Sequence, residues 1–254
     1  MKMMKVGLIG FGRTGKAVAS VILDNPDICL EWVMRKSHIL EHRSVPEFLG
    51  IESREPGFIH SIDEFTAEGL LDHLPVDVII DFSSATGIHY YGKAAADQGV
   101  TIVSAISHYE QSEIEVLHTL AEKTRVLWSP NITVGINFMI TAAKVLRRIT
   151  PDTDIEIIEE HFKGKTGASG TALRIASELN VEACEVRSIR AGGIIGTHEI
   201  LFGFPFQTVR LRHESISREA FGKGAMFAAE HLIDKPNGLY RMEDLMLPYF
   251  GSSE

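Results

Sequence analysis

Cysteine is scarce in this chain of 254 residues, with Cys29 and Cys184 as the only two. Two thiols cannot form a disulfide framework, and both lie in apolar-flanked segments, so reduced and buried side chains are expected. Long apolar runs are also missing, because the run in the opening MKMMKVGLIGFG is far too short for a signal sequence or a membrane span. We therefore expect a cytoplasmic protein with no membrane partner.

Positive charge is in deficit. The chain has 25 Lys and Arg against 34 Asp and Glu, a formal net charge of −9, and no long basic block. This balance argues against nucleic acid or an anionic membrane surface as the main partner. The content of 44% hydrophobic and 23% charged residues is ordinary for a globular protein, and the length allows one large domain or two smaller ones.

Short apolar runs alternate with helical patterns over the first 130 residues. Continuous β-branched runs separated by helices predict a parallel sheet covered on both faces, as in a Rossmann-type α/β domain. The expected strands are Lys5–Ile9, Cys29–Met34, Val76–Ile80, Thr101–Ser104 and Val126–Trp128, and the expected helices are Lys16–Leu23, Ile88–Gln98 and Gln111–Thr124.

The pattern changes after Trp128, where strand-like runs follow one another with few helices between them. This order predicts a second, α+β domain with a mixed or antiparallel sheet. Its expected helices are Ile136–Ile149 and Gly170–Leu179, its strands are Asp154–Glu160, Val186–Ala191, Gly196–Phe202 and Thr208–Ser215, and the helix Arg218–Ile233 follows. We predict a dinucleotide-binding domain of residues 1–130 with 219–254, and a substrate-binding and oligomerisation domain of residues 131–218.

A glycine-rich turn joins the first predicted strand to the first helix, in the order Gly10, Phe11, Gly12, Arg13, Thr14, Gly15. This context favours a dinucleotide site, since Gly10 permits a tight turn, Gly12 lets the backbone approach a pyrophosphate, and Gly15 lets helix and strand pack closely. Free N–H groups at the helix N-terminus would face the phosphate charge. A tight turn without a ligand is the alternative.

The end of the second predicted strand indicates which dinucleotide is bound. An NAD site usually has an acidic residue there for the ribose hydroxyls, whereas this strand ends in Arg35 and Lys36, and Glu31 comes too early. A guanidinium and an ammonium suit a 2′-phosphate. We therefore predict that NADPH is preferred, with NADH as the second donor; a solvated basic loop is the alternative.

The segment from Glu156 to Ala172 carries the richest chemistry of the chain. His161 is its natural general acid, because the pKa of an unperturbed imidazole lies near neutrality. Ser169 and Thr171 can cap the helix that restarts there, and its free N–H groups together with Lys165 can bind a carboxylate. A basic surface loop followed by a capped helix is the alternative from chemistry alone.

This segment resembles the signature of the dihydrodipicolinate reductase (4-hydroxy-tetrahydrodipicolinate reductase) family, which reads roughly E-x-H-H-x-x-K-x-D-A-P-S-G-T-A. Five further segments are similar to motifs of that family in the same order: Gly10–Gly15, Asp81–Ser83, Asn131–Asn137, Arg190–Glu199 and His213–Phe221. The resemblance covers nearly the whole chain.

The resemblance implies reduction of a cyclic dicarboxylate to tetrahydrodipicolinate by a nicotinamide dinucleotide, in lysine and diaminopimelate biosynthesis, by a homotetramer. By position, His161 matches the general acid and Lys165 the catalytic lysine, while Ser169, Gly170 and Thr171 match the loop that holds a substrate carboxylate. The implied cofactor-binding set adds Phe82, Ser104, Ala105, Ile106, Ser129, Pro130, Asn131, Ile132 and Arg218 to the glycine-rich turn, Arg35 and Lys36.

Three departures from the family pattern keep two other functions open. Phe162 replaces a second histidine, the loop before Ser169 lacks an Asp and a Pro and is one residue shorter, and Ser104–Ile106 replaces G-T-T. The alternatives are a diverged enzyme for another cyclic imine or unsaturated dicarboxylate, and a catalytically silent NADPH-binding sensor.

The remaining candidates give no further chemistry. His108, His198, His213 and His231 show no metal-ligand spacing, so no metal is assigned, and His198 and His213 are expected to be structural or interfacial. The apolar stretch Phe202–Phe206 belongs either to the core or to an oligomer surface of the second domain's sheet, and the family resemblance favours the surface.

Overall fold

The structure, a computed structural model, describes residues 3–53 and 55–251. The chain forms two compact units, one of Met1–Thr133 with Phe221–Leu245 and one of Val134–Ala220 with Met246–Glu254. The described residues from Met246 onward thus belong to the second unit, where the sequence analysis placed them with the first. Within that unit Phe250 stacks on Phe138, with ring centroids 5.5 Å apart.

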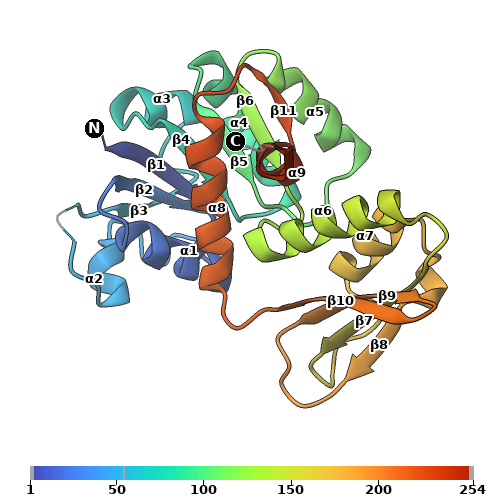
Figure 1. Cartoon of the computed structure of the whole chain (residues 1–254). Helices are drawn as coiled ribbons and strands as arrows, with labels where there is room; N and C mark the ends of the chain where they lie inside the picture. Colours follow the sequence, from blue (N-terminus) through green and yellow to red (C-terminus); the bar gives the residue numbers. More distant parts are fainter. Residues whose placement is uncertain (1–2, 54, 252–254) are drawn as a thin grey trace. The chain divides into compact units, whose positions relative to one another are not determined.

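The first unit is built on a parallel sheet of seven strands in the order β11-β6-β5-β4-β1-β2-β3 (Figure 1). The predicted parallel sheet of Rossmann type is confirmed. The strands are β1 (Met4–Ile9), β2 (Ile28–Arg35), β3 (Phe58–Ser61), β4 (Val78–Asp81), β5 (Thr101–Ser104), β6 (Arg125–Trp128) and β11 (Gly238–Tyr240).

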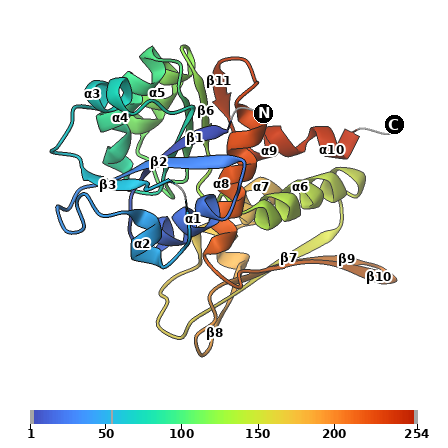
Figure 2. The same ribbon diagram turned by 90° about the vertical axis from the view of Figure 1, so that its left-hand side faces the viewer.

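Helices cover both faces of this sheet (Figure 2). On one side lie α1 (Arg13–Leu23) and α8 (Glu219–Leu232), which approach so closely that a Cβ at Gly222 would lie 2.8 Å from the Cβ of Val21. On the other side lie α3 (Ala67–His73), α4 (Ile88–Asp97) and α5 (Gln111–Ala121). Their apolar faces enclose a core with the buried rings of Trp32 and Tyr91 near its centre.

The second unit has a mixed sheet of four strands in the order β10-β9-β7-β8. Its strands are β7 (Asp154–His161), β8 (Arg187–Arg190), β9 (Thr197–Phe204) and β10 (Gln207–Glu214). The strand β7 pairs parallel with β8 and antiparallel with β9, and β9 pairs antiparallel with β10. The helices α6 (Val134–Ile149) and α7 (Gly170–Leu179) lie over one face of this sheet (Figures 1 and 2).

Period-two alternation decides which side chains of this sheet meet the helices. Ile157 lies opposite Ile200 in the register, and both are fully buried against the apolar faces of α6 and α7 together with Phe202. The prediction of a mixed sheet in a second α+β unit is confirmed.

The structure adds short elements that the sequence analysis left irregular or took as turns. They are α2 (Val45–Leu49), α9 (Met242–Met246), α10 (Pro248–Gly251) and the 3-10 helices η1 (Ala85–Gly87) and η2 (Ala183–Glu185), besides β3, α3 and β11. The expectation of two buried thiols is wrong for Cys184, which is exposed within η2, whereas Cys29 is buried in β2. No helix within the described ranges has the length and apolarity that a membrane crossing requires.

Phe202 and Phe206 provide a matched pair for testing the second core. Phe202 is fully buried, whereas Phe206 is fully exposed at the turn between β9 and β10. Phe202→Ala is expected to lower the free energy of unfolding by about 3–5 kcal/mol, because it leaves a cavity. Phe206→Ala should change it by less than about 0.5 kcal/mol. Urea unfolding followed by circular dichroism measures both, and equal effects would contradict this core.

Candidate functional site

A cavity of about 440 Å³ lies in the first unit where β1, β2 and β4 end. Three segments line it: the turn after β1, the end of β2 and the loop after β4. The lining residues are Ile9, Gly10, Phe11, Gly12, Met34, Arg35, Lys36, Ser37, Ile62, Ser83, Ser84, Thr86, Gly87 and Tyr90. The position matches the rule that ligands of open α/β sheets bind at the carboxyl ends of the strands.

The glycine-rich turn leaves space where a phosphate would need it. Gly10 has φ +96°, which favours glycine, and a Cβ at Gly15 would lie 2.0 Å from the carbonyl oxygen of Gly10. A Cβ at Gly12 would meet no atom within 4 Å. Gly10 and Gly15 are therefore required by the turn itself, while Gly12 leaves open space beside the N-terminus of α1 for a pyrophosphate.

The charges around the cavity are positive. Arg35 and Lys36 line it beside Ser37, and none of the described lining residues is acidic. The Arg35 guanidinium donates one hydrogen bond to the carbonyl oxygen of Ile39 at 2.8 Å, which holds it in place. Glu31, in the middle of β2, forms an ion pair with Lys5 at 2.9 Å. An arginine and a lysine at this position can bind an anionic group of a dinucleotide.

Asp81 shapes the loop that forms the opposite wall. Its fully buried carboxylate accepts hydrogen bonds from the Ser83 N–H at 2.8 Å, the Ser83 hydroxyl at 2.6 Å and the Tyr91 hydroxyl at 2.9 Å. Burial raises the pKa of Asp81 although these hydrogen bonds oppose the shift. The bonds bring Ser83 and Ser84 to the cavity, whereas the backbone of Phe82 packs against Gly10 and does not line it.

The other residues that the resemblance assigns to cofactor binding lie at the ends of the neighbouring strands β5 and β6. Ser104 ends β5 and is followed by Ala105 and Ile106, and Ser129–Ile132 follow β6. Both groups therefore lie along the same sheet edge as the cavity without lining it. Their hydroxyls have partners of their own: Ser104 is hydrogen-bonded to the Tyr109 hydroxyl at 2.8 Å, and Ser129 donates to the Asn131 carbonyl at 2.7 Å.

The resemblance also assigns Arg13, Thr14 and Arg218 to cofactor binding, and these residues lie in α1 or in the second unit. Arg13 and Thr14 begin α1 and do not line the cavity. Arg218 is exposed immediately before α8 and belongs to the second unit.

In the second unit, the strand register assembles a row of polar side chains across the sheet. Glu159 lies opposite Ser188 on one side and His198 on the other, and His198 lies opposite His213. This row comes two residues after the apolar pair Ile157 and Ile200, and therefore shares their helix-covered face. On the helix-covered face of this sheet, apolar side chains therefore lie at one end and titratable side chains at the other.

Glu159 is the fully buried centre of this row. Its carboxylate accepts hydrogen bonds from the Ser188 hydroxyl at 2.6 Å, from Nη2 of Arg190 at 2.5 Å and from Nδ1 of His161. Burial alone would raise the pKa of Glu159, but the hydrogen bonds from Arg190, Ser188 and His161 outweigh it and lower the pKa to about 2. Glu159 is therefore an anion at neutral pH.

The bond to Glu159 orients His161 at the end of β7. Because Nδ1 faces the carboxylate, Nε2 is the nitrogen that can exchange a proton. A Cβ at Gly196 would lie 3.0 Å from this Nε2, so only glycine leaves it uncrowded. The ring of His198 stands edge-on to His161, with centroids 5.3 Å apart.

Arg190 connects the loop of residues 162–168, called the reactive loop below, to the same carboxylate. Besides Glu159, its guanidinium donates to the carbonyl oxygens of Lys165 at 3.0 Å and Gly167 at 2.5 Å. The Lys165 N–H also donates to the Phe162 carbonyl at 3.0 Å. The Lys165 backbone is thus fixed, while its ammonium group has no hydrogen-bond partner among residues 3–53 and 55–251 and is available to an anion.

The N-terminus of α7 faces the same loop. Ser169 is the N-cap, its hydroxyl accepting from the Ala172 N–H at 3.1 Å, and it is hydrogen-bonded to Nε2 of His198 at 2.9 Å. Gly170 and Thr171 form the first turn, where the helix dipole favours a carboxylate. The second unit therefore combines an anion-binding helix end, a lysine and an oriented imidazole.

Sequence analysis did not identify Glu159 and Arg190 as parts of the site, and it interpreted His198 and His213 as structural or interfacial. The structure places Glu159, Arg190 and His198 beside His161, and His213 opposite His198. Nδ1 of both His198 and His213 is buried with no hydrogen-bond partner among the described residues. The available signal was the spacing of Ile157, Glu159 and His161, which puts the last two on the face of the apolar residue.

Comparison with known proteins agrees with these observations. Residues 4–132 match the family model of the dihydrodipicolinate reductase N-terminus, and residues 132–246 match that of its C-terminus. A 4-hydroxy-tetrahydrodipicolinate reductase of Caldanaerobacter subterraneus subsp. tengcongensis is 33% identical over 67% of this chain and 76% of its own length. That of Buchnera aphidicola subsp. Schizaphis graminum is 27% identical over 98% and 99%.

A solved structure shows the same fold. The dipicolinate-bound dihydrodipicolinate reductase from Paenisporosarcina sp. TG-14 is 22% identical, with a TM-score of 0.77, over 95% of this chain and 99% of that one. The family resemblance predicted from the motifs is confirmed.

Acid should destabilise the folded chain through His198. Burial, with a smaller contribution from His161, lowers the pKa of His198 from 6.5 to about 4. In this pH range His198 binds a proton in the unfolded state but not in the folded state. The free energy of unfolding should therefore fall by about 3 kcal/mol as the pH drops from 6.5 towards 4. Glu159, whose pKa is lowered, contributes only in the lower window between 4.5 and 2.

Urea unfolding at a series of pH values measures this effect. His198→Gln keeps a polar group for Ser169 and removes the titration of His198, so its stability should fall less between pH 6.5 and 4 than that of wild type. The remaining fall comes in part from His213, whose pKa is also lowered by burial. His108→Gln, at an exposed position of the first unit, is the matched control and should keep the wild-type slope. Equal slopes for His198→Gln and wild type would contradict the assignment.

Proposed function

Since the chain belongs to the dihydrodipicolinate reductase family, we propose that it reduces 4-hydroxy-tetrahydrodipicolinate to tetrahydrodipicolinate with a reduced nicotinamide dinucleotide. The first unit binds the dinucleotide and the second binds the cyclic dicarboxylate. The observation that supports this most directly is the joint placement of His161, Lys165 and the α7 N-terminus around Glu159 and Arg190.

The proton is supplied by His161. When bound, the dinucleotide supplies the hydride, and the net reaction consumes one hydride and one proton and releases water. The Glu159 carboxylate holds Nδ1 of His161, which keeps Nε2 as the donating nitrogen. Glu159 acts through His161 and is a positioning residue.

The substrate carboxylates are held by the reactive loop and α7. Lys165 supplies a positive charge, and Ser169, Gly170 and Thr171 supply a hydroxyl and backbone N–H groups at the helix N-terminus. Arg190 keeps this loop ordered without substrate, since it binds the carbonyl oxygens at both Lys165 and Gly167. Little conformational entropy then remains to be lost on binding.

NADPH is the preferred donor. Arg35 and Lys36 bind the 2′-phosphate, the N-terminus of α1 with Gly12 binds the pyrophosphate, and no acidic side chain lines the described cavity to hold a ribose hydroxyl. The loops after β5 and β6, with Ser104–Ile106 and Ser129–Ile132, extend the site along the same sheet edge towards the nicotinamide.

We further propose a cytoplasmic homotetramer assembled through the second unit. Its four-stranded sheet carries α6 and α7 on one face only, and its edge strand β10 exposes Thr208, Arg210 and Arg212. A bare sheet face with an open edge strand is a surface that a second copy can cover.

Replacing the proton donor or the lysine should abolish turnover and leave cofactor binding intact. His161→Gln and Lys165→Ala are each expected to lower kcat about 100- to 10,000-fold, because a positioned acid is lost or a substrate charge is left without its partner. The assay follows NADPH oxidation by absorbance, with substrate made in place by a dihydrodipicolinate synthase from pyruvate and aspartate semialdehyde.

NADPH affinity, measured by fluorescence, should stay within about twofold of wild type in both variants. Lys163→Ala, which removes an exposed lysine of the same loop, is the control and should keep its activity. Wild-type protein that binds NADPH and shows no turnover would refute the proposed substrate. Full activity in His161→Gln would refute the role of the imidazole.

Donor preference should depend on the end of β2. The double variant Arg35→Ser with Lys36→Ser is expected to weaken NADPH binding about 10- to 150-fold, since hydrogen bonds to a charged group contribute about 1.5–3 kcal/mol. NADH binding should change little, because NADH lacks the 2′-phosphate. Titrations of both dinucleotides measure this, with Lys123→Ser as a surface control, and parallel losses for the two would contradict the assignment.

A further inference from the structure

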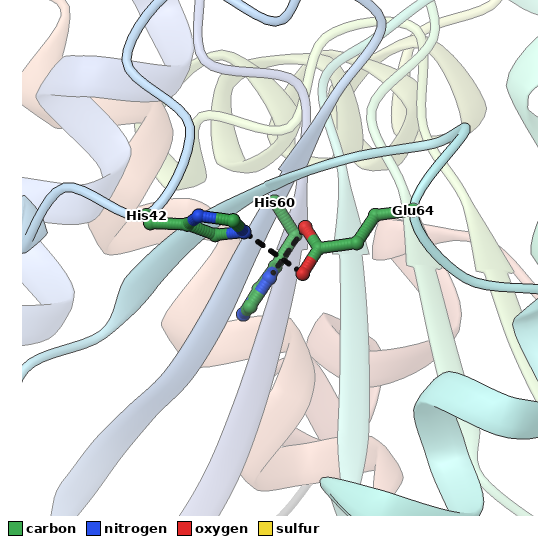
Figure 3. A group of neighbouring side chains, drawn as sticks. All are labelled: His42, His60 and Glu64. Carbon is green, nitrogen blue, oxygen red and sulfur yellow. Dashed lines mark hydrogen bonds and ion pairs between the residues drawn. The ribbon is translucent and has the colours of Figure 1, made fainter.

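Two histidines and a glutamate converge outside the site described so far, where β3 ends (Figure 3). His42 comes from the loop before α2, His60 from β3, and Glu64 from the turn that follows β3. One carboxylate oxygen of Glu64 lies 2.9 Å from Nε2 of His42, and the other lies 3.0 Å from Nδ1 of His60. Both imidazoles therefore direct a nitrogen at the same carboxylate.

Backbone hydrogen bonds fix the two loop positions before any ligand arrives. The N–H of His42 donates to the carbonyl of Ile59 at 2.7 Å, and the N–H of Glu64 donates to the carbonyl of Ser61 at 3.0 Å. His42 has φ +60°, an uncommon backbone conformation for a residue other than glycine. Figure 3 shows its ring turned towards Glu64.

His60 is the most rigid of the three side chains. It is 8% exposed, and its ring packs edge-on against Phe65 with centroids 5.4 Å apart. The His42 side chain is exposed, so the cluster is open to solvent on that side. One ligand is thus held firmly and another can shift slightly, which suits an accessible ion site.

The local charge favours a cation. Glu64 contributes a carboxylate that both imidazoles already contact. Two more carboxylates lie on the same surface, because His38 contacts Glu41 at 3.4 Å and Asp63 at 3.2 Å. The formal charge of the whole chain is −9.

We propose that His42, His60 and Glu64 form a binding site for a divalent transition-metal ion of the zinc class. Their ligand atoms all lie within 4.8 Å of one another. Ligands at roughly 2.0–2.1 Å in tetrahedral geometry lie about 3.3 Å apart, so small outward shifts of His42 and Glu64 create the place for the ion. Water occupies the fourth position on the exposed side.

The donor set selects the class of metal. Two imidazole nitrogens with one carboxylate suit Zn²⁺ and its neighbours, whereas Mg²⁺ and Ca²⁺ require mostly oxygen ligands. The ion replaces the imidazole protons that now bridge to Glu64, and it cross-links the loop before α2 to the sheet edge. Within the described ranges, this is the one group of three such residues with metal-ligand geometry. The sequence analysis assigned no metal, because it considered His108, His198, His213 and His231, which lack metal-ligand spacing, and did not consider these three residues.

Zinc binding can be measured directly and does not depend on the reductase activity. Tag-free, chelator-stripped full chain carrying Cys184→Ser, which removes the exposed thiol, is titrated with Zn²⁺ against a chromophoric chelator. About one equivalent of Zn²⁺ should bind and raise Tm, since an ion that binds only the folded state stabilises it. Co²⁺ should give the visible ligand-field bands of a tetrahedral site.

Three variants test the ligands. His42→Asn tolerates the left-handed backbone, Glu64→Gln keeps the shape of the side chain, and each should weaken Zn²⁺ binding at least about 10- to 100-fold and remove the Tm increase. His38→Ala, on the same loop but outside the cluster, is the matched control and should bind as the parent does. Circular dichroism without metal checks that each variant folds.

Two results would overturn the site. One is a parent protein that binds neither Zn²⁺ nor Co²⁺ more tightly than a variant lacking both His42 and Glu64. The other is undiminished binding in folded His42→Asn and Glu64→Gln, which would place the ion elsewhere.

Discussion

The buried carboxylate of Glu159 is the interaction on which the second unit's site depends. A fully buried anion is costly unless every oxygen is hydrogen-bonded, and here Ser188, Arg190 and His161 supply the donors. Two of these donors also serve the site directly, since Arg190 ties the reactive loop and His161 presents its other nitrogen. Removing either partner therefore leaves a charge uncompensated and releases a functional group at the same time. Stability and catalytic geometry are maintained by the same few bonds.

The first unit also has a buried carboxylate that organises a loop, but this carboxylate has a different role. Asp81 is also fully buried at a strand end, but its partners are neutral hydroxyls and an N–H, and burial raises its pKa. Its bonds hold a loop that carries Ser83 and Ser84 to the cavity. Asp81 shapes a binding surface, whereas Glu159 orients a proton donor, because only Glu159 has cationic partners.

Local sequence patterns were sufficient for the parts of the fold and site that lie close together in the chain. The glycine turn from Gly10 to Gly15, the cations after β2, and His161 with Lys165 could each be found within a few residues. The strand β3, Phe58–Ser61, was missed because it follows Gly50 and Pro56, which indicate loops, and ends in the polar residues His60 and Ser61. The sequence analysis could not find partners that strand register brings together, such as Glu159 with His198, or that a loop brings together, such as His42 with Glu64. Residue spacing along the chain determines neither the strand register nor the path of a loop.

The double anchoring of the loop between Lys165 and Ser169 has a consequence for how this protein can change in evolution. One end is held by Arg190 and the other by the N-cap of α7, so residues between the anchors can be deleted without moving either end. The loop is already one residue shorter than the family signature. A single deletion within β7 would instead turn Glu159 and His161 to the opposite face of the sheet. Length variation is therefore tolerated between the anchors and selected against in the strand.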